Sequence, residues 1–316
     1  MFAQRRNLFR LSFLKMLHDI SLFWKRSRVA LQRGALSGET LGVYLAKNRF
    51  SQSFVRDFVA PLGAAIWSCP AIHLMDFPAE TFFKFFENHG FLSYSGQPRW
   101  QTVVGGSSAY VDAILRKSRI EVLLNSRLRG VRRSPDGPVL IDHNGAQRQF
   151  DAVVIATHAD QALQLLLDPS PSETRILGAW RYENNHAVLH SSLSYLPPER
   201  RAWASWNYKR ERGEREDSSI SITYHMNRLQ GLNCANEYCV TLNPRRMIDQ
   251  RGVISEVRFS HPVYNFDSIR SQRELASLQG QRRTWYCGSY FGYGFHEDAI
   301  RAGHSAAQAI LDARWH

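Results

Sequence analysis

Three glycines and the helix predicted after them form the part of this sequence best suited to chemistry. Gly288, Gly292 and Gly294 follow a short apolar run at 285–287, and a helix is predicted to begin near His296. Glycines let the backbone approach a flat or phosphorylated ligand closely. A helix start presents N–H groups and the positive end of the helix dipole. The pattern indicates a strand, a glycine-rich turn and a helix, which is either a packed βα turn or a ligand site.

A general base is harder to identify. Six of the histidines are scattered along the chain, and each is more typical of a structural residue than of a catalytic one: His73, His89, His158, His186, His225 and His296. We favour His296 as the catalytic candidate because it lies in the glycine-rich turn. None of the six lysines stands in a motif that would identify a catalytic lysine.

Residues 1–100 are predicted to be mostly helical. Apolar residues recur at helical spacing from Leu8 to Leu31, which indicates one or two amphipathic helices, and Thr40 to Ala60 indicates two short ones. A further helix is predicted from Pro78 to Asn88, where proline suits the first turn. Four phenylalanines give that helix a wide buried face: Phe82, Phe83, Phe85 and Phe86.

The middle of the chain has a different pattern. Gly105, Gly106 and Ser107 precede a predicted helix, Ser108 to Arg116. Strands from Leu128 to Arg132 and from Val139 to His143 flank a Pro-Asp-Gly turn. The continuous apolar run from Phe150 to Ala156 predicts a strand covered on both faces. A helix from Thr157 to Leu167 is expected to follow.

Residues 175–265 alternate in short strand-like runs, typical of an antiparallel sheet. The predicted strands are His186 to Ser191, Trp203 to Tyr208, Ser219 to Tyr224, and Glu256 to Phe259. After the glycine-rich turn, the last helix is expected to place one face against a sheet, with Gly303 and Ala306 allowing close packing. That face carries Ala299, Gly303, Ala306, Ala307 and Ile310.

The segment WYCGSYFGYGFHEDAIRAG resembles the C-terminal flavin-binding motif of the flavin amine-oxidase superfamily. Further stretches are similar, in order along the chain, to a bacterial branch of predicted NAD/FAD-binding proteins found beside cyclopropane-fatty-acid synthases: PLGAAIWSCP, FFENHGFL, QPRWQTVVGGSSAYV, FDAVVIATHADQAL, YHMNRLQGL, VTLNP and GYGFHEDAIRAG. The resemblance implies an α/β (α+β) fold in which an incomplete FAD/NAD(P)-binding Rossmann-like domain is interleaved with a substrate domain of helices and an antiparallel sheet.

This resemblance implies FAD as cofactor and a set of binding residues. Gly288 matches the glycine beside the pyrophosphate, Phe295 the aromatic residue beside the isoalloxazine ring, and Leu128 the strand position near adenine. Ala156 and Thr157 lie where the chain passes the dinucleotide. The complete implied set is Gly105, Gly106, Ser107, Leu128, Ala156, Thr157, Gly288, Ser289, Gly294, Phe295, His296, Glu297 and Ala299. As purely structural residues, Leu128 and Ala156 are expected to be buried.

The resemblance also implies a division at 1–100 (helical part of the substrate domain), 101–168 (part of the FAD domain), 169–279 (sheet part of the substrate domain) and 280–316 (C-terminal motif). Two departures stand out. Ser289 and Tyr290 occupy the position of the family's carboxylate, and a hydroxyl is expected to bind more weakly. No GxGxxG occurs in the chain, although enzymes of this fold begin with strand–GxGxxG–helix. We therefore expect a truncated product, a misassigned start or a degenerate paralogue.

The composition narrows the class of protein. The net charge is +12 with a pI of about 9.8, which favours anionic partners, including an acidic membrane surface. No zinc-finger, RNP-type or basic-helix pattern accompanies the charge, so nucleic acid is not expected to be a partner. Four scattered cysteines without a CxxC pair predict neither a disulfide framework nor a metal site. A basic N-terminus without a secretory apolar run leaves a mitochondrial-type presequence open, and a cytoplasmic location is the simplest expectation.

These observations leave three hypotheses. The first is a truncated FAD-dependent oxidoreductase of the amine-oxidase type, which transfers a hydride from an amine or a lipid/acyl substrate to flavin. The second is a non-catalytic remnant or partner-binding fragment that cannot hold FAD. The third, supported by charge alone, is a basic nucleic-acid-binding protein. The substrate, the electron acceptor, the true start and the oligomeric state are not readable from the sequence.

Overall fold

The computed structural model describes residues 5–93, 98–99, 101–208 and 221–313. The chain forms two compact units, each built from two separate segments. The first contains Met1–Ile120 and Glu183–His261, and the second contains Glu121–Tyr182 and Pro262–His316. The functional division predicted from the sequence stays a prediction. Gln97 and Trp100 of the QPRW motif, and Ser219 at the start of a predicted strand, lie outside the described residues.

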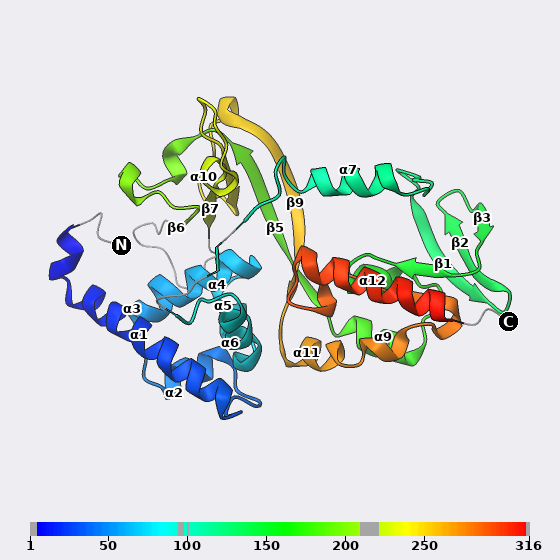
Figure 1. Ribbon diagram of the computed structural model, residues 1–316, viewed down its shortest axis with the longest axis horizontal. Helices are drawn as coiled ribbons and strands as arrows, with labels where there is room; N and C mark the ends of the chain where they lie inside the picture. The colour runs from blue at the N-terminus through cyan, green and yellow to red at the C-terminus, as the bar shows by residue number, and fades with distance from the viewer. Residues whose placement is uncertain (1–4, 94–97, 100, 209–220, 314–316) are drawn as a thin grey trace. The chain divides into compact units, whose positions relative to one another are not determined.

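Helices make up the N-terminal part of the first unit (Figure 1), as predicted. They are α1 (Leu11–Gln32), α2 (Leu41–Lys47), α3 (Gln52–Phe54), the π-helical turn η2 (Val55–Val59), α4 (Ala60–Trp67), α5 (Ala71–Met75), α6 (Ala79–Asn88) and α7 (Ser108–Lys117). Side-chain caps fix two of the starts, because Thr40 Oγ1 accepts from Val43 N at 3.2 Å and Ser51 Oγ accepts from Phe54 N at 3.3 Å.

Aromatic side chains form the core of this helical part. All four phenylalanines of α6 are buried, as their spacing predicted. Phe83 meets Phe23 of α1 edge-on, with 5.3 Å between ring centroids, while Phe82 stacks on Phe86 at 4.1 Å. Such pairs add to the free energy gained from burying the rings. Helix α6 therefore contributes a buried aromatic face to this core and contacts α1 and α2.

A five-stranded sheet, in the order β6-β7-β8-β5-β9, completes this part of the fold. Its strands are β5 (Arg181–His190), β6 (Trp206–Tyr208), β7 (Ile222–His225), β8 (Cys239–Leu242) and β9 (Val253–Val263), and α10 (Met226–Gln230) follows β7. The pairs β6/β7, β7/β8 and β5/β8 are antiparallel, which confirms the predicted type of sheet. The prediction missed β8, because Cys239–Leu242 is too short to show a period.

The second unit contains two small sheets. A three-stranded antiparallel sheet is made of β1 (Leu128–Ser134), β2 (Gly137–Asp142) and β3 (Gln147–Gln149). Its first turn is the predicted one, since Ser134 pairs with Gly137 across Pro135-Asp136. The other sheet is a parallel pair, β4 (Val153–Ile155) with β10 (Thr284–Tyr286). The remaining helices are α8 (Ala159–Leu165), α9 (Pro171–Gly178), α11 (Phe266–Gln272) and α12 (His296–Asp312).

Two expectations about this unit are wrong. The 150–156 run is not covered on both faces: Val154 is 41% exposed, because the parallel sheet has only two described strands and β4 is at its edge. The predicted packing face of α12 is confirmed at Ala306 and Ile310 and wrong at Gly303 and Ala307. Ala302 and Ala306 pack on Trp285 and Cys287, whereas a side chain at Gly303 would meet open space and Ala307 is exposed.

Candidate functional site

The carboxyl ends of β4 and β10 meet, and this brings together two segments that the sequence singled out. The strands are parallel with Ile155 opposite Tyr286, and the amide of Cys287 donates to the carbonyl of Ile155 at 3.2 Å. Directly beyond the strands, a Cβ at Gly288 would lie 3.3 Å from the carbonyl oxygen of Thr157. Ligands of parallel sheets bind at this end of the strands.

Beyond Gly288 the chain makes a single turn of 3-10 helix, η8 (Ser289–Phe291), and then enters α12. Phe295, His296 and Glu297, at the start of α12, are exposed. A helix of 17 residues places the positive end of its dipole at this point. The second unit therefore presents an exposed helix start that follows directly from its parallel strands, suited to an electron-rich group.

The three glycines of the turn are closely surrounded by the chain's own side chains. A Cβ at Gly292 would lie 2.0 Å from Oδ1 of Asp298, and one at Gly294, where φ is +96°, would lie 2.9 Å from the hydroxyl of Tyr264. A Cβ at Gly288 would lie 2.7 Å from the ring of Tyr290. The chain's own side chains fill these spaces, so the turn itself requires the glycines, and their predicted role beside a ligand stays a prediction.

Three side chains hold the turn, and sequence reasoning missed all of them. The buried Asp298 accepts from the amides of Tyr293 at 3.0 Å and Phe295 at 3.1 Å. The carbonyl of Gly292 accepts from Gln272 Nε2 at 2.7 Å and from the hydroxyl of Tyr264 at 3.0 Å. Asp298 had a signal, an acid three residues after the helix N-cap. Gln272 and Tyr264 had none, because they come from a distant segment.

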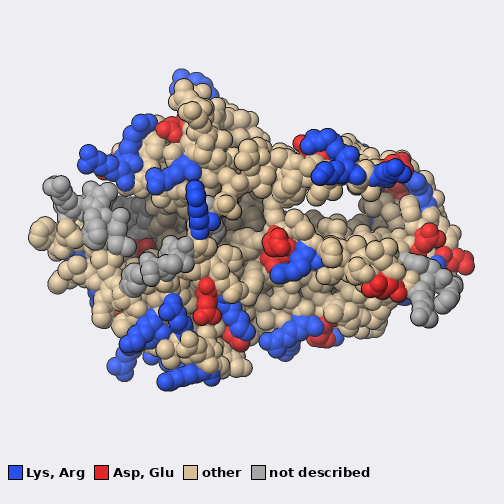
Figure 2. Space-filling view, viewed as in Figure 1, with Lys and Arg blue, Asp and Glu red and all other residues tan. Residues whose placement is uncertain are grey.

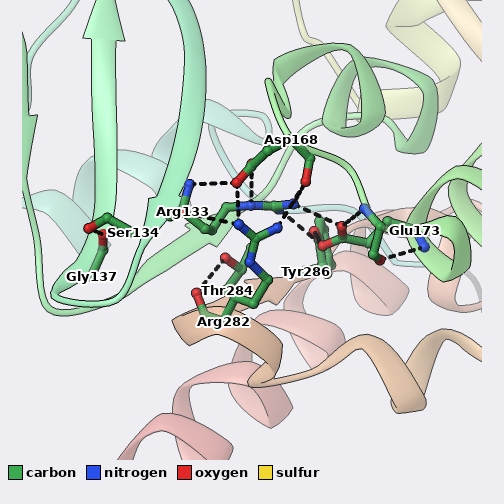
Figure 3. A network of polar contacts seen from close by, with 9 residues as sticks. Arg133, Ser134, Gly137, Asp168, Glu173, Arg282, Thr284 and Tyr286 are labelled. Carbon is green, nitrogen blue, oxygen red and sulfur yellow. Dashed lines mark hydrogen bonds and ion pairs between the residues drawn. The ribbon is translucent and has the colours of Figure 1, made fainter.

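A buried ion-pair network fixes the strand that carries the turn (Figure 3). The guanidinium of Arg133, on β1, binds both carboxylate oxygens of Glu173, on α9, at 3.0 and 2.9 Å, and its Nε lies 2.7 Å from Asp168 Oδ1. Tyr286, the last residue of β10, donates its hydroxyl to Glu173 at 2.6 Å. Arg282, just before β10, pairs with Asp168 and donates to the carbonyl of Arg133 at 3.0 Å. Both ends of β10 are thus tied to the antiparallel sheet.

The charges of this network shift one another's pKa values. Burial is the largest influence on Glu173 and opposes its ionisation, but the hydrogen bonds from Arg133, the Ser170 amide and Tyr286, with the charge of Arg133, together outweigh burial, so the pKa of Glu173 is lowered. Burial likewise opposes the charged form of Arg133, and Glu173 reverses the effect, so the pKa of Arg133 is raised. Burial, and then its hydrogen bond to Glu173, raises the pKa of Tyr286. The network is therefore ionic, with Tyr286 a neutral donor.

The other residues implied by the resemblance differ in the unit to which they belong and in their exposure. Gly105 and Gly106 have φ of +82° and +83° and lead into α7, and together with Ser107 they belong to the first unit. Leu128 is 41% exposed at the start of β1, and Ala156 is exposed beside Thr157. The burial expected of Leu128 and Ala156 as structural residues is therefore wrong, because they stand at the open ends of short strands.

A metal site and a membrane-spanning helix can each be looked for among the described residues. No three His, Cys, Asp or Glu side chains in the described ranges are arranged to hold a metal ion. None of the helices in those ranges is long and apolar enough to cross a bilayer. The observed arrangement consists of the carboxyl ends of the parallel strands β4 and β10, followed by the start of α12.

A family model described as flavin containing amine oxidoreductase matches residues 5–190, more than half of the chain. The chain belongs to the flavin-containing amine oxidoreductase family. FAD is the cofactor of this family. The match confirms both predictions made from the sequence motifs, FAD as the cofactor and an FAD-dependent oxidoreductase as the class of enzyme. The match ends before the glycine-rich turn, so the roles of the individual turn residues stay predictions.

Solved structures of flavin enzymes share this fold. A conjugated-linoleic-acid-producing fatty acid isomerase from P. acnes is 12% identical with a TM-score of 0.62, covering 96% of this chain and 76% of its own. Putrescine oxidase bound to putrescine is 10% identical, with a TM-score of 0.61 and coverage of 94% and 76%. Cyclohexylamine oxidase from Brevibacterium oxydans is 12% identical, with a TM-score of 0.55 and coverage of 88% and 68%. No curated protein sequence matches the chain.

The chain's residues fit one end of FAD. The exposed start of α12 suits the flavin edge, where negative charge develops on reduction. The hydroxyl of Tyr290, at the family's carboxylate position, is buried and has no partner among the described residues. For the pyrophosphate, the sequence offers no GxGxxG helix start.

Proposed function

We propose that this chain is the flavin-edge and substrate part of an FAD-dependent oxidoreductase, with the isoalloxazine ring at the exposed start of α12, beyond the joined carboxyl ends of β4 and β10. The observation that carries this proposal is the parallel pairing of β4 with β10, which sets Thr157 close to Gly288 directly before the exposed start of α12. When bound, FAD would accept a hydride or its equivalent from a C–H bond of the substrate, while the neighbouring N–H or C–H loses a proton and the C–N or C–C single bond becomes a double bond.

The chain's own residues would bind the flavin and hold it in position. The dipole of α12 would stabilise negative charge at the flavin N1/O2 edge, with Glu297 and Ala299 contributing backbone rather than side chain. Phe295, 37% exposed, would pack on the ring. His296 stays our candidate for moving a proton, since its side chain is exposed at the same helix start. Asp298 would keep this turn in place from inside.

We further propose that the pyrophosphate requires a strand–GxGxxG–helix unit, which these 316 residues lack. Two surfaces support this. The outer edge of β4 has no described partner strand, although parallel sheets are normally larger and covered. Helix α7 buries none of its residues, and its apolar stripe is exposed at Val111 (44%), Ile114 (55%) and Leu115 (41%). An amphipathic helix with no covered face lacks a packing partner.

The substrate class rests on weaker support. One structural neighbour binds putrescine, an amine, and another is a fatty acid isomerase. We propose an amine or a lipid/acyl substrate, and the same basic chain would favour peripheral contact with an acidic membrane surface. In the view of Figure 2, the Lys and Arg side chains are separated by uncharged and acidic surface, so this face has no continuous basic patch.

Anaerobic reduction of the bound flavin tests the function. The chain, joined to a strand–GxGxxG–helix unit and loaded with FAD, would be mixed with putrescine, with a longer alkylamine and with a monounsaturated fatty acid. Bleaching at 450 nm by one class identifies the substrate type. A flavin that stays oxidised with every substrate but is reduced by dithionite would support the alternative of a non-catalytic remnant.

A further inference from the structure

Strand β9 is the edge strand of the five-stranded sheet, and its centre is exposed on both faces (Figure 1). Six consecutive residues, from Ile254 to Phe259, are exposed. The apolar members Val257, Phe259 and Ile254 are 44%, 49% and 54% exposed. No described strand pairs with the outer edge of β9. An edge of this length, with unpaired backbone groups and apolar side chains, is a template for another strand.

Two of the devices that block such an edge are missing from the centre of β9, which is neither short nor interrupted by proline. Natural edge strands are made short, or carry proline or charged side chains, to prevent pairing. The charges at the centre of β9, Glu256 and Arg258, have opposite signs. The strand has 11 residues, and its proline, Pro262, stands near its end. The segment from Val253 to His261 therefore keeps all its N–H donors, and its central residue is Val257.

That segment is complementary to itself. In an antiparallel pair of identical strands, a two-fold axis passes between one residue and its own copy. With the axis at Val257, Glu256 lies opposite Arg258 of the second copy, and this pair occurs twice. Val253 then lies opposite His261, and Pro262 falls outside the paired segment. Opposite charges placed directly across two strands stabilise the pair.

Neighbouring registers lack this match. An axis at Glu256 places two copies of that carboxylate against each other, and an axis at Arg258 does the same with two guanidinium groups. Like charges directly opposite are destabilising. The axis at Val257 also brings the two copies of its apolar side chain together. Charge therefore selects one register and one occupant, a second copy of this chain.

We propose that β9 pairs antiparallel with β9 of a second copy about a two-fold axis at Val257, so that two five-stranded sheets join into one. The inference is independent of flavin binding, because it depends only on the first unit's edge strand. It assigns the chain a homodimer interface whose specificity comes from Glu256 and Arg258.

Charge exchange tests the register. Sedimentation velocity over a range of protein concentrations should show a monomer–dimer equilibrium. R258E leaves the ion pair between His186 and Glu256 (2.8 Å) intact. It places the new glutamate opposite Glu256 of the second copy, so the dimer should dissociate about tenfold more readily. The double variant E256R/R258E restores opposite charges and should restore the dimer. A monomeric parent chain, an unchanged R258E dimer, or a folded double variant that stays as weak as R258E would each overturn the proposal.

Disulfide trapping supplies a second measurement. In a C234S background, which removes the exposed cysteine, V257C should form a disulfide-linked dimer on mild oxidation. Residues directly opposite each other have Cα atoms about 4.5 to 5.5 Å apart, within the range that a disulfide spans. The control I254C would lie about 20 Å from its own copy and should stay monomeric on a non-reducing gel. Equal cross-linking of both variants would contradict the register.

Discussion

The carboxylate of Asp298 fills the space that a side chain at Gly292 would need. A Cβ at Gly292 would lie 2.0 Å from Oδ1 of Asp298, while Oδ2 accepts from the amides of Tyr293 and Phe295. The turn before α12 is thus wrapped around an acid from the helix it leads into. Because this contact is made entirely within the second unit, it can be tested without cofactor or substrate.

Two glycine-to-alanine changes in this region should have opposite effects. Gly292→Ala should destabilise the protein by about 1–3 kcal/mol, because an added methyl forces the packed turn apart. Gly303→Ala should leave stability unchanged or raise it by up to about 1 kcal/mol, because it replaces a helical glycine where nothing lies within 4 Å. Chemical denaturation measures both. Equal losses would show that the turn is not packed as described.

The ion pair between Arg133 and Glu173 should be a large contributor to stability once formed. Arg133→Met leaves a carboxylate that is 3% exposed without its partner, which should cost about 3–5 kcal/mol of unfolding free energy. Arg175→Met, which breaks the exposed pair with Glu274 in the same unit, is the matched control and should change little. A similar midpoint shift for both variants would argue against a buried network.

Acid should weaken the same network. The pKa of Glu173 is lowered in the folded protein, so the unfolded chain binds the proton more tightly. The stabilisation from Glu173 is complete above its unfolded pKa, near 4.5, and is lost as pH falls through the folded value. Glu173→Gln should therefore lower stability at neutral pH and flatten its dependence on pH below that point. Denaturation curves between pH 7 and pH 3 compare the two proteins, and parallel curves would assign the acid sensitivity elsewhere.

Two exposed apolar residues at opposite ends of α12 should differ in their effect on the affinity for FAD. Phe295→Ala should weaken FAD binding about tenfold, since stacking on an aromatic ring contributes about 0.5–1.5 kcal/mol. Leu311→Ala, at the other end of α12 and 78% exposed, is the control and should bind FAD like the parent. Titration with FAD, followed by quenching of flavin fluorescence, gives both constants. Equal constants would remove Phe295 from the site.

Much of the fold could be predicted from local patterns. Four phenylalanines at helical spacing predicted the buried face of α6, and the Pro-Asp-Gly turn predicted the β1–β2 hairpin, because both depend on neighbouring residues. The parallel pairing of β4 with β10 has no local signal, since paired positions such as Ile155 and Tyr286 are 131 residues apart in the sequence.

The strand, turn and helix of the candidate site were predictable, but the side chains that support the turn were not. Gln272, Tyr264 and Arg133 reach the turn or its strand from distant segments and carry no motif of their own, and the binding of FAD at the turn stays a prediction. Packing also overturned the reading of Gly303, whose neighbour Ala302 faces Trp285 instead. A helix face is hard to assign to within one residue when alanines lie all around it, as in α12, because their small side chains give a weak hydrophobic period.

The FAD content of the purified protein is the most direct test of the central claim. The 316-residue chain, alone and joined to a strand–GxGxxG–helix unit, would be incubated with FAD, desalted and measured at 450 nm. We predict about one flavin per joined chain, little for the chain alone, and a thermal transition raised by FAD only in the joined form. A joined protein that folds cooperatively but stays colourless would contradict the flavin site, and full flavin retention by the chain alone would contradict the need for the added unit.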